Sequence, residues 1–259
     1  MSDNLYYPKL PQMLYEMIVG LMVSVNDFVD ENLTVNPRLL LVPCDYYIYS
    51  WAVMASWYSA LIKNHKIKKI IIVSNSSKEK FSWYAIPSFS NYKNILSDIK
   101  ISNETYELFE SYKDFHSIDW IDSFDNIDCQ IPFIISTIKP ETILPILVWK
   151  TNRYIKLVNF IVESLKDEGT AVVISWNLSN NFDQKDMLKK DSKQAQAIVQ
   201  NDIKTLNSSV DESNILLRIF SSVCKKKWYD INPLIYSNSS EFDDTWKLSR
   251  WYFSMVAGD

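Results

Sequence analysis

Six side chains in this sequence have the types that enzymes and binding sites use, and most of them follow a run of apolar residues. They are Cys44, Ser77, Asp128, Asn177, Asn180 and Cys224. A cysteine thiolate is a nucleophile and a ligand for soft metal ions. Serine, asparagine and aspartate act mainly through hydrogen bonds, and serine and asparagine are poor ligands for transition metals. The set therefore favours hydrogen bonding, with two sulfur atoms as the reactive groups.

The chemistry of the three cysteines, Cys44, Cys129 and Cys224, depends most on their surroundings. Cys44 follows an apolar run directly, where a thiolate can be exposed and activated; the alternative is a small buried apolar side chain. Cys224 follows a predicted helix and is interpreted as structural unless it meets Cys44. Together the two would hold a soft ion such as Cu(I) or form a regulatory disulfide. An odd number of cysteines does not favour a disulfide framework, which is also rare in a reducing compartment.

Other residues capable of acid–base or metal chemistry are few. The only histidines are His65, interpreted as a solvated cap at a helix end, and His116, expected in a surface loop. Asp128 stands beside Cys129 and by itself is interpreted as a solvated or capping aspartate. The sequence contains no G-x-G-x-x-G, P-loop, H-E-x-x-H or G-x-S-x-G motif. Nothing in these patterns predicts a phosphate-binding loop or a zinc protease.

Composition excludes several classes of protein. The formal net charge is −4, from 27 basic and 31 acidic residues, and the densest basic run is only Lys225–Lys227. The electrostatic footprint of a nucleic-acid-binding protein is therefore missing. The chain begins without a signal-peptide pattern, and its longest nearly uncharged segment, 13–25, contains Glu16 and is too short to span a bilayer. We expect a cytoplasmic protein without a membrane span.

The elements that must position these residues are short apolar strands alternating with amphipathic helices. Strands are predicted over 38–43, 68–74, 142–149 and 169–175, with an interruption or a start at Pro145, and the C-terminal segment reads as a closing strand. Helices are predicted over 13–28, 50–62 with Ser50 as N-cap, 104–112, 152–167, 191–206 and 213–223. This alternation is typical of a layered α/β fold, in which sites gather at the carboxyl ends of strands. We expect one domain over residues 1–259.

Glycine is unusually rare in this chain. Only three occur, where average usage would give about 18. Turns that require a positive φ are therefore expected to use Asn, Asp or Ser.

Several segments, taken in order, resemble the Memo family (AmmeMemoRadiSam system protein B), whose fold is similar to that of the class III extradiol dioxygenases. "PCDYYIYSW" (43–51) is similar to the family's P-H-A-G-Y-x-Y-S-G, and "FDNIDCQIPF" (124–133) to its E-H-S-I-E-x-Q-L-P-F. Weaker similarities are "IIIVSNSS", "ILPILVW", "SWNLSNN" and "LSRWYFSMV". The resemblance spans nearly the whole chain and implies a single α/β/α domain with a mixed, mostly parallel sheet.

In the family, a cleft lined by histidines, an aspartate and a cysteine can bind a metal. The resemblance places the first histidine at Cys44, the second at Ser77 and the third at Asn180. The aspartate falls on Asn177, and the cysteine is kept as Cys224. Large side chains stand where the family has glycines or a serine, and we expect three of them to fill the pocket: Tyr46, Trp51 and Trp176.

These replacements favour a degenerate Memo-like protein that is not catalytic, holds no cofactor and acts by binding another protein. A first alternative is a redox enzyme that uses Cys44 and Cys224, either as thiols or as ligands for copper or iron. A second alternative is a small-molecule binder in the remodelled cleft, with Ser77, Asp128, Asn177 and Asn180 as hydrogen-bonding groups. The partner and the oligomeric state do not follow from the sequence.

Overall fold

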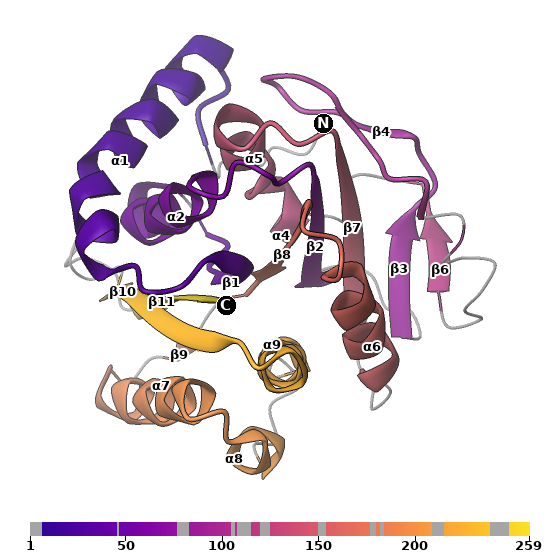
Figure 1. The fold of residues 1–259 in the computed structure, drawn as a ribbon. Coiled ribbons are helices and arrows are strands. Elements are labelled where there is room, and N and C mark those ends of the chain that lie inside the picture. The colour runs from indigo at the N-terminus through magenta and orange to yellow at the C-terminus, as the bar shows by residue number, and fades with distance from the viewer. Residues whose placement is uncertain are drawn as a thin grey trace.

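A computed structural model describes most of the chain as one sheet with helices on both sides (Figure 1). It describes residues 7–45, 47–76, 83–104, 107, 115–119, 125–149, 154–176, 180–181, 184–208, 215–238 and 249–259. The strands are β1 (Pro37–Val42), β2 (Lys69–Asn75), β3 (Trp83–Pro87), β4 (Asn91–Tyr92), β5 (Ile99–Lys100), β6 (Phe115–Ile118), β7 (Thr142–Trp149), β8 (Thr170–Ser175), β9 (Asn180–Asn181), β10 (Asp230–Asn238) and β11 (Ser249–Gly258). The helices are α1 (Pro11–Asn32), α2 (Tyr47–Ile62), α4 (Asp125–Asp128), α5 (Ile131–Thr137), α6 (Ile155–Ser164), α7 (Gln184–Val199), α8 (Ile203–Ser208) and α9 (Ile215–Lys227).

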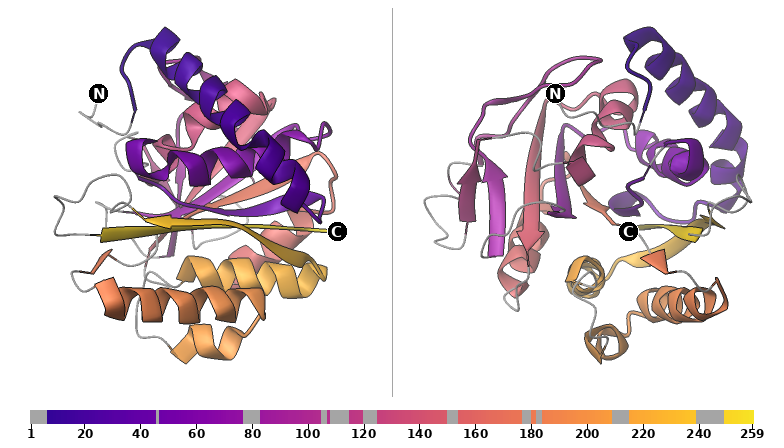
Figure 2. Two further views of the ribbon diagram at one scale, coloured as in Figure 1. Left: turned by 90° about the vertical axis from the view of Figure 1, so that its left-hand side faces the viewer. Right: turned by 180° about the vertical axis from the view of Figure 1, so that it is seen from behind.

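The described strands form a sheet in the order β10-β11-β1-β8-β2-β7-β3-β6, with β9 paired to β11 and a separate β4–β5 ribbon. The central pairs β1–β8, β8–β2 and β2–β7 are parallel, whereas β11 runs antiparallel to both β1 and β10. Helices α1, α2 and α5 cover one face, and α6 to α9 cover the other (Figure 2). This arrangement confirms the predicted layered α/β/α fold with a mixed, mostly parallel sheet.

The central strands are buried on both sides, which explains why they read as continuous apolar runs in the sequence. Every residue of β1 and β8 is buried, and so are the five inner residues of β2. Parallel strands covered by helices on both faces have no solvent side, so they show no polar alternation.

Strand β7 passes through Pro145 without the predicted interruption. Pro145 lies opposite Ile72 in the parallel ladder with β2. On the other side of β7, strand β3 pairs only with 147–149. A proline has no N–H to donate, so it fits where the neighbouring strand does not reach.

Two helix boundaries differ from the sequence-based expectation. Helix α2 begins at Tyr47, and the Ser50 hydroxyl donates back to the Asp45 carbonyl at 3.3 Å from within the helix, so Ser50 is not its N-cap. The predicted helix 191–206 is two helices, α7 and α8, separated at Asn201, which has φ of 55°. Asp202 then caps α8 by accepting from the backbone N–H of Thr205 at 3.2 Å.

Positive φ angles in the described residues occur at Lys139, Asn201 and Trp228, and no described glycine has one. Asn201 fits the expectation that asparagine replaces glycine at such turns. Lys139 and Trp228 are not of the expected types, and both lie just after a helix, where the chain reverses.

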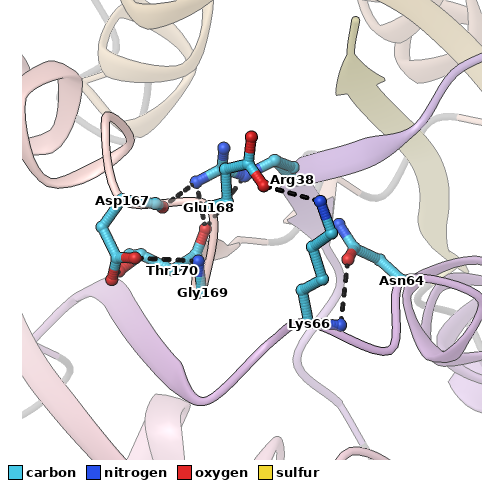
Figure 3. A network of polar contacts seen from close by, with 7 residues as sticks. All are labelled: Arg38, Asn64, Lys66, Asp167, Glu168, Gly169 and Thr170. Atoms are coloured by element: carbon cyan, nitrogen blue, oxygen red, sulfur yellow. Dashed lines mark hydrogen bonds and ion pairs between the residues drawn. The ribbon is translucent and has the colours of Figure 1, made fainter.

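A polar network closes the amino ends of the central strands (Figure 3). Arg38 of β1 is buried and donates to the Thr170 carbonyl at 2.7 Å and to the Asp167 carbonyl. Glu168 forms an ion pair with Lys66, which ties the turn before β8 to the turn before β2. This edge of the sheet is therefore held by structural contacts, and Cys44 and Trp176 lie at the opposite, carboxyl edge.

Candidate functional site

The carboxyl ends of β1, β2 and β8 meet at one edge of the sheet because these strands are parallel neighbours. Cys44 follows β1 by two residues, Ser76 follows β2, and Trp176 follows β8. The Trp176 N–H donates to the Val42 carbonyl at 2.7 Å, which holds the first and third segments together. The strand ends that the sequence predicts to lie at one edge of the sheet are therefore neighbours in the structure.

The α4–α5 segment, residues 125–137, lies against these strand ends through α4. The Asn126 amide donates to the Asn75 carbonyl at 2.9 Å, and the Ser175 hydroxyl donates to the Asn126 carbonyl at 2.7 Å. Most of this segment belongs to "FDNIDCQIPF", the stretch with the strongest resemblance to the family. It forms two short helices, α4 and α5.

Gln130 is the polar centre of the edge and is completely buried. Its amide nitrogen donates to the Pro43 carbonyl at 2.8 Å and to the Ser175 hydroxyl at 3.1 Å. Its amide oxygen accepts from the Tyr58 hydroxyl of α2 at 2.9 Å. The Gln130 side chain thus uses both its donor and its acceptor groups, and it joins α2, the end of β1 and β8.

Cys44 is joined to Cys129 by a disulfide, with the two Cα atoms 6.0 Å apart. The disulfide considered from the sequence joins Cys44 only to Cys224, and the structure pairs Cys44 with Cys129 instead; contacts between residues 85 positions apart leave no local pattern. The Tyr47 hydroxyl donates to the Cys129 carbonyl at 2.6 Å, so the strand-end turn and the α4–α5 segment are linked twice. Both cysteines are almost fully buried, at 4% and 0% exposure.

Cys224 lies at the other end of the sheet. It is in the last turns of α9, and the Tyr229 N–H donates to its carbonyl at 3.1 Å just before β10 begins. Asp230 of β10 lies opposite Gly258, which lies opposite Pro37 at the start of β1. Cys44 follows the end of that strand, and six extended residues span about 20 Å. Cys44 and Cys224 therefore do not share a cleft, which the resemblance implied and the redox alternative required. Burial raises the pKa of the Cys224 thiol.

Asp128 takes part in a hydrogen-bonded group beside this edge. The Tyr7 hydroxyl donates to the Asp128 carboxylate at 2.8 Å, and the Asn94 amide donates to the Tyr7 oxygen at 3.3 Å. Burial and the neighbouring Asp128 carboxylate raise the pKa of Tyr7. The Tyr7 ring also contacts the Tyr47 ring, with centroids 5.4 Å apart. Asp128 thus anchors the segment that leads into α1.

The large side chains expected in the pocket have separate outcomes. Trp176 is buried, and its indole N–H has no hydrogen-bond partner among the described residues. Trp51 is half-buried on α2. Tyr46, Ser77 and Asn177 lie outside the described residues. Asn180 is in β9, paired with Arg250 of β11, and its side chain is likewise outside the description. Whether these groups converge on one cavity stays a prediction.

A groove of about 520 Å³ in the described part of the chain lies elsewhere. It is lined by Pro11, Gln12, Tyr15, Leu96, Ser97, Asp98, Ile99, Ile135, Ser136, Lys139 and Pro140. Pro140 precedes β7, so this groove sits toward the amino ends of the strands and on the α1–α5 face. Within the residues that the structure describes, no three His, Cys, Asp or Glu side chains are grouped as a metal site.

Comparison with known proteins settles the family. A family model described as "Memo-like protein" matches residues 4–224, most of the chain. The chain belongs to the Memo-like family. The match ends at Cys224, so β10 and β11 lie beyond it.

One solved structure supports the fold of this Memo-like chain. An uncharacterized protein of Escherichia coli K12 is 12% identical, with a TM-score of 0.52, over 85% of this chain and 99% of that one. At this identity the similarity concerns the fold alone. No curated protein matches the sequence. No helix among the described segments is both long and apolar enough to cross a membrane.

Proposed function

We propose that this Memo-like chain is non-catalytic and acts by binding a protein partner. The observation that supports this most is at Cys44, which stands where the resemblance places the family's first metal-binding histidine. Its sulfur is bonded to the sulfur of Cys129. Around it, Gln130, Ser175 and Asn126 bond to each other and to the backbone. Polar groups that are already paired in a buried place have little capacity left for a substrate.

A transition metal of the kind that the family resemblance implies does not fit the side chains described at this edge. A disulfide sulfur is not a thiolate, and the thiolate is the form that ligates metals. Cys224, the other sulfur carried over by the resemblance, lies near the start of β1 rather than its end. Asparagine and serine at the remaining positions are weak donors for such ions.

Metal analysis tests the loss of metal chemistry. Protein purified anaerobically without chelators and reduced with a phosphine should hold far less than one equivalent of copper, iron or zinc. Cys44→Ser, Cys129→Ser and Cys224→Ser should all give the same result as the parent chain. A full equivalent that is lost in Cys44→Ser, and retained in Cys224→Ser, would contradict the proposal.

Binding is tested through the most exposed large apolar side chain of the described residues, Trp228, at 91% exposure. Tryptophan is enriched at protein interfaces relative to the rest of the surface. A partner captured from the host extract by the parent chain should be lost with Trp228→Ser and kept with Ile155→Ser, a matched change on α6. Equal recovery with all three baits would remove Trp228 from the interface, and no saturable binding by the parent chain would contradict the proposal.

A second candidate is thiol redox chemistry, which the contact between Cys44 and Cys129 favours. Cys129, rather than the expected Cys224, is then the partner of Cys44. Two protein thiols would reduce one small disulfide such as oxidised glutathione, giving the protein disulfide and two small thiols. Catalysed reduction of a small disulfide, with excess reduced glutathione regenerating the two protein thiols and itself becoming oxidised glutathione, that disappears in both Cys44→Ser and Cys129→Ser would support this function. Stoichiometric exchange without turnover would leave the pair as a structural or regulatory link.

A further inference from the structure

The outer face of α1 carries apolar side chains that no described residue covers. Val23 is 71% exposed, Met13 55% and Val19 42%. Tyr15, Val19 and Val23 are spaced by four residues, so they form one stripe along the helix. The N-terminal end of the stripe borders the groove, because Pro11, Gln12 and Tyr15 are among the residues that line it. The buried face of α1, formed by Leu14, Ile18, Val25 and Val29, already packs on the rest of the chain, so the stripe is additional.

Gly20 lies in the middle of this exposed helix. A Cβ atom placed there would meet nothing within 4 Å, so no contact inside the chain requires a glycine. Glycine in a helix interior destabilises it by about 0.5–1 kcal/mol relative to alanine. In a chain with three glycines, the one on the exposed helix face permits another backbone to come close.

Charge on α1 is divided along its length. The helix has four acids and no Lys or Arg, and three of the acids, Asp27, Asp30 and Glu31, stand in its last two turns. Asp30 is paired with Lys63 of its own chain, whereas Asp27 and Glu31 form no ion pair within the described residues. The first end of α1 carries the positive end of the helix dipole. Lys139, in the adjoining groove, is exposed and has no ion-pair partner among the described residues.

We propose that a second copy of this chain covers α1 through an antiparallel pairing of the two α1 helices, with the two-fold axis at Val19. Residue n then faces residue 38 − n of the partner copy. Val19 meets its own counterpart and Val23 faces Tyr15. Asp27 comes over Pro11, at the mouth of the groove that holds Lys139. A parallel pairing would instead place the acidic ends against each other.

Size and symmetry agree with this pairing. A helix of 22 residues is about 33 Å long, so two paired α1 helices would be in contact over about the diameter of a small domain. A two-fold interface must be self-complementary, which is provided by the apolar centre of α1, by the acids of its last two turns, and by the helix dipole and Lys139 at its first end. The inference does not depend on the proposed loss of metal chemistry.

The mass in solution tests the pairing. Sedimentation equilibrium should give a species of about 61 kDa, twice the 30.3 kDa chain, which dissociates on dilution. Val19→Asp places two carboxylates at the axis and should weaken the dimer at least about 100-fold, as a buried unpaired charge does. The matched control Ile155→Asp, at an exposed position of α6, should leave the dimer unchanged. Far-UV circular dichroism of each variant verifies the fold.

A charge exchange tests the antiparallel direction. Asp27→Lys and Lys139→Glu should each weaken the dimer about 3- to 10-fold, within the range of exposed ion pairs. The double variant carries both changes in every copy and should recover most of the affinity, because residue 27 of one copy lies at the mouth of the groove that holds residue 139 of the other. Without recovery, the antiparallel pairing is wrong.

Two outcomes overturn the proposal. The first is a monomer at all concentrations. If that monomer binds a synthetic lysine-rich amphipathic helix, and Val19→Asp abolishes the binding, the occupant of α1 is a basic partner protein and not a second copy. The second is a dimer that Val19→Asp leaves intact, which would place the interface on another surface.

Discussion

Gln130 is the single residue on which most of the polar contacts at the strand ends depend. Replacing it with leucine leaves the Tyr58 hydroxyl, the Pro43 carbonyl and the Ser175 hydroxyl each with one bond fewer. An unsatisfied buried group costs about 1–3 kcal/mol, so we expect Gln130→Leu to lower the free energy of unfolding by about 3 kcal/mol. Urea titration followed by circular dichroism measures this loss. Gln196→Leu, at an exposed position of α7, should change stability by less than about 0.5 kcal/mol. Similar losses in the two variants would refute the central role of Gln130.

The three cysteines should differ sharply in their reaction with alkylating agents. A peptide map without reductant should show the Cys44 and Cys129 peptides linked. Cys224 is fully buried, and burial raises the pKa of its thiol, so little thiolate exists at pH 8. Iodoacetamide should therefore modify Cys224 in the native chain only at the rate of unfolding, and rapidly in urea. Fast labelling of Cys224 in the folded chain, or a link between Cys224 and Cys44, would contradict the structure.

At this scale the sequence predicts which residues lie at the strand ends better than which residues touch. Cys44 and Trp176 lie where the order of strands and loops places them. The pairing of Cys44 with Cys129, and the bonding of Gln130 to Pro43, join segments that are more than 80 residues apart. Cys129 stands directly beside Asp128 in the stretch 124–133. The resemblance of this stretch to a family motif is the signal in the sequence that it lies at the site. The resemblance also assigns Cys224 to the site by its residue type and its order along the chain, but Cys224 lies at the other end of β1. A match of this kind therefore does not guarantee a place in the site.

Among the elements, the turn between α6 and β8 makes a definite prediction for acid stability. The pKa of Asp167 is lowered, first by the Gly169 N–H and then by the Thr170 hydroxyl, which both donate to its carboxylate. A carboxyl whose pKa is lower in the folded state stabilises the fold above its unfolded pKa of about 3.9, and this contribution disappears as pH falls through the folded pKa. The free energies of unfolding of the parent and Asp167→Asn should thus differ at pH 6 and converge by about pH 2. A difference that is independent of pH would show that the carboxylate is not the source.

Two glycines should respond in opposite ways to the same substitution. At Gly20 a Cβ meets open space, so Gly20→Ala should raise the free energy of unfolding of the dilute chain by about 0.5–1 kcal/mol. At Gly258, where β11 pairs with the start of β1, a Cβ would lie 1.7 Å from the Asn36 carbonyl oxygen. Gly258→Ala must displace backbone and should lower the free energy of unfolding by more than about 2 kcal/mol. Thermal and urea unfolding of both variants measure the pair, and equal effects would contradict the packing at Gly258.

Periodicity predicts long elements in this chain and fails for short ones. The buried strands β1, β2, β7 and β8 and the helices α1, α6 and α9 match the expected ranges to within a few residues, because their apolar patterns are strong. The strands β4, β5 and β9 have two residues each, too few for any period, and the expected helix 104–112 lies mostly outside the described residues. The break between α7 and α8 depends on the backbone of Asn201, which an apolar stripe running through both helices conceals.

For the whole molecule, the sequence predicts the layers but not the order of the strands. Alternating strands and helices predict helices on both faces of a mostly parallel sheet, as observed. The final strand β11 enters between β1 and β10, so the last residues of the chain complete the sheet next to its first strand. Long-range pairing of this kind has no local signature. The alternating pattern of the C-terminal segment predicts a closing strand there, but not which strands it pairs with.

This closing strand predicts that the chain unfolds as one unit, in keeping with the expected single domain over 1–259. The Asn36 N–H donates to the Asp259 carbonyl at 3.0 Å, and α1 packs on α2 and α5, so both ends of the chain contribute to one core. Removing residues 249–259 exposes an edge of β1 and separates β10 from the sheet. Urea transitions monitored by tryptophan fluorescence and by far-UV circular dichroism, at a fixed thiol redox state, should therefore coincide, and the truncated chain should show no cooperative transition. Two separate transitions, or a truncated chain that retains one, would mean that the segment before β10 folds independently.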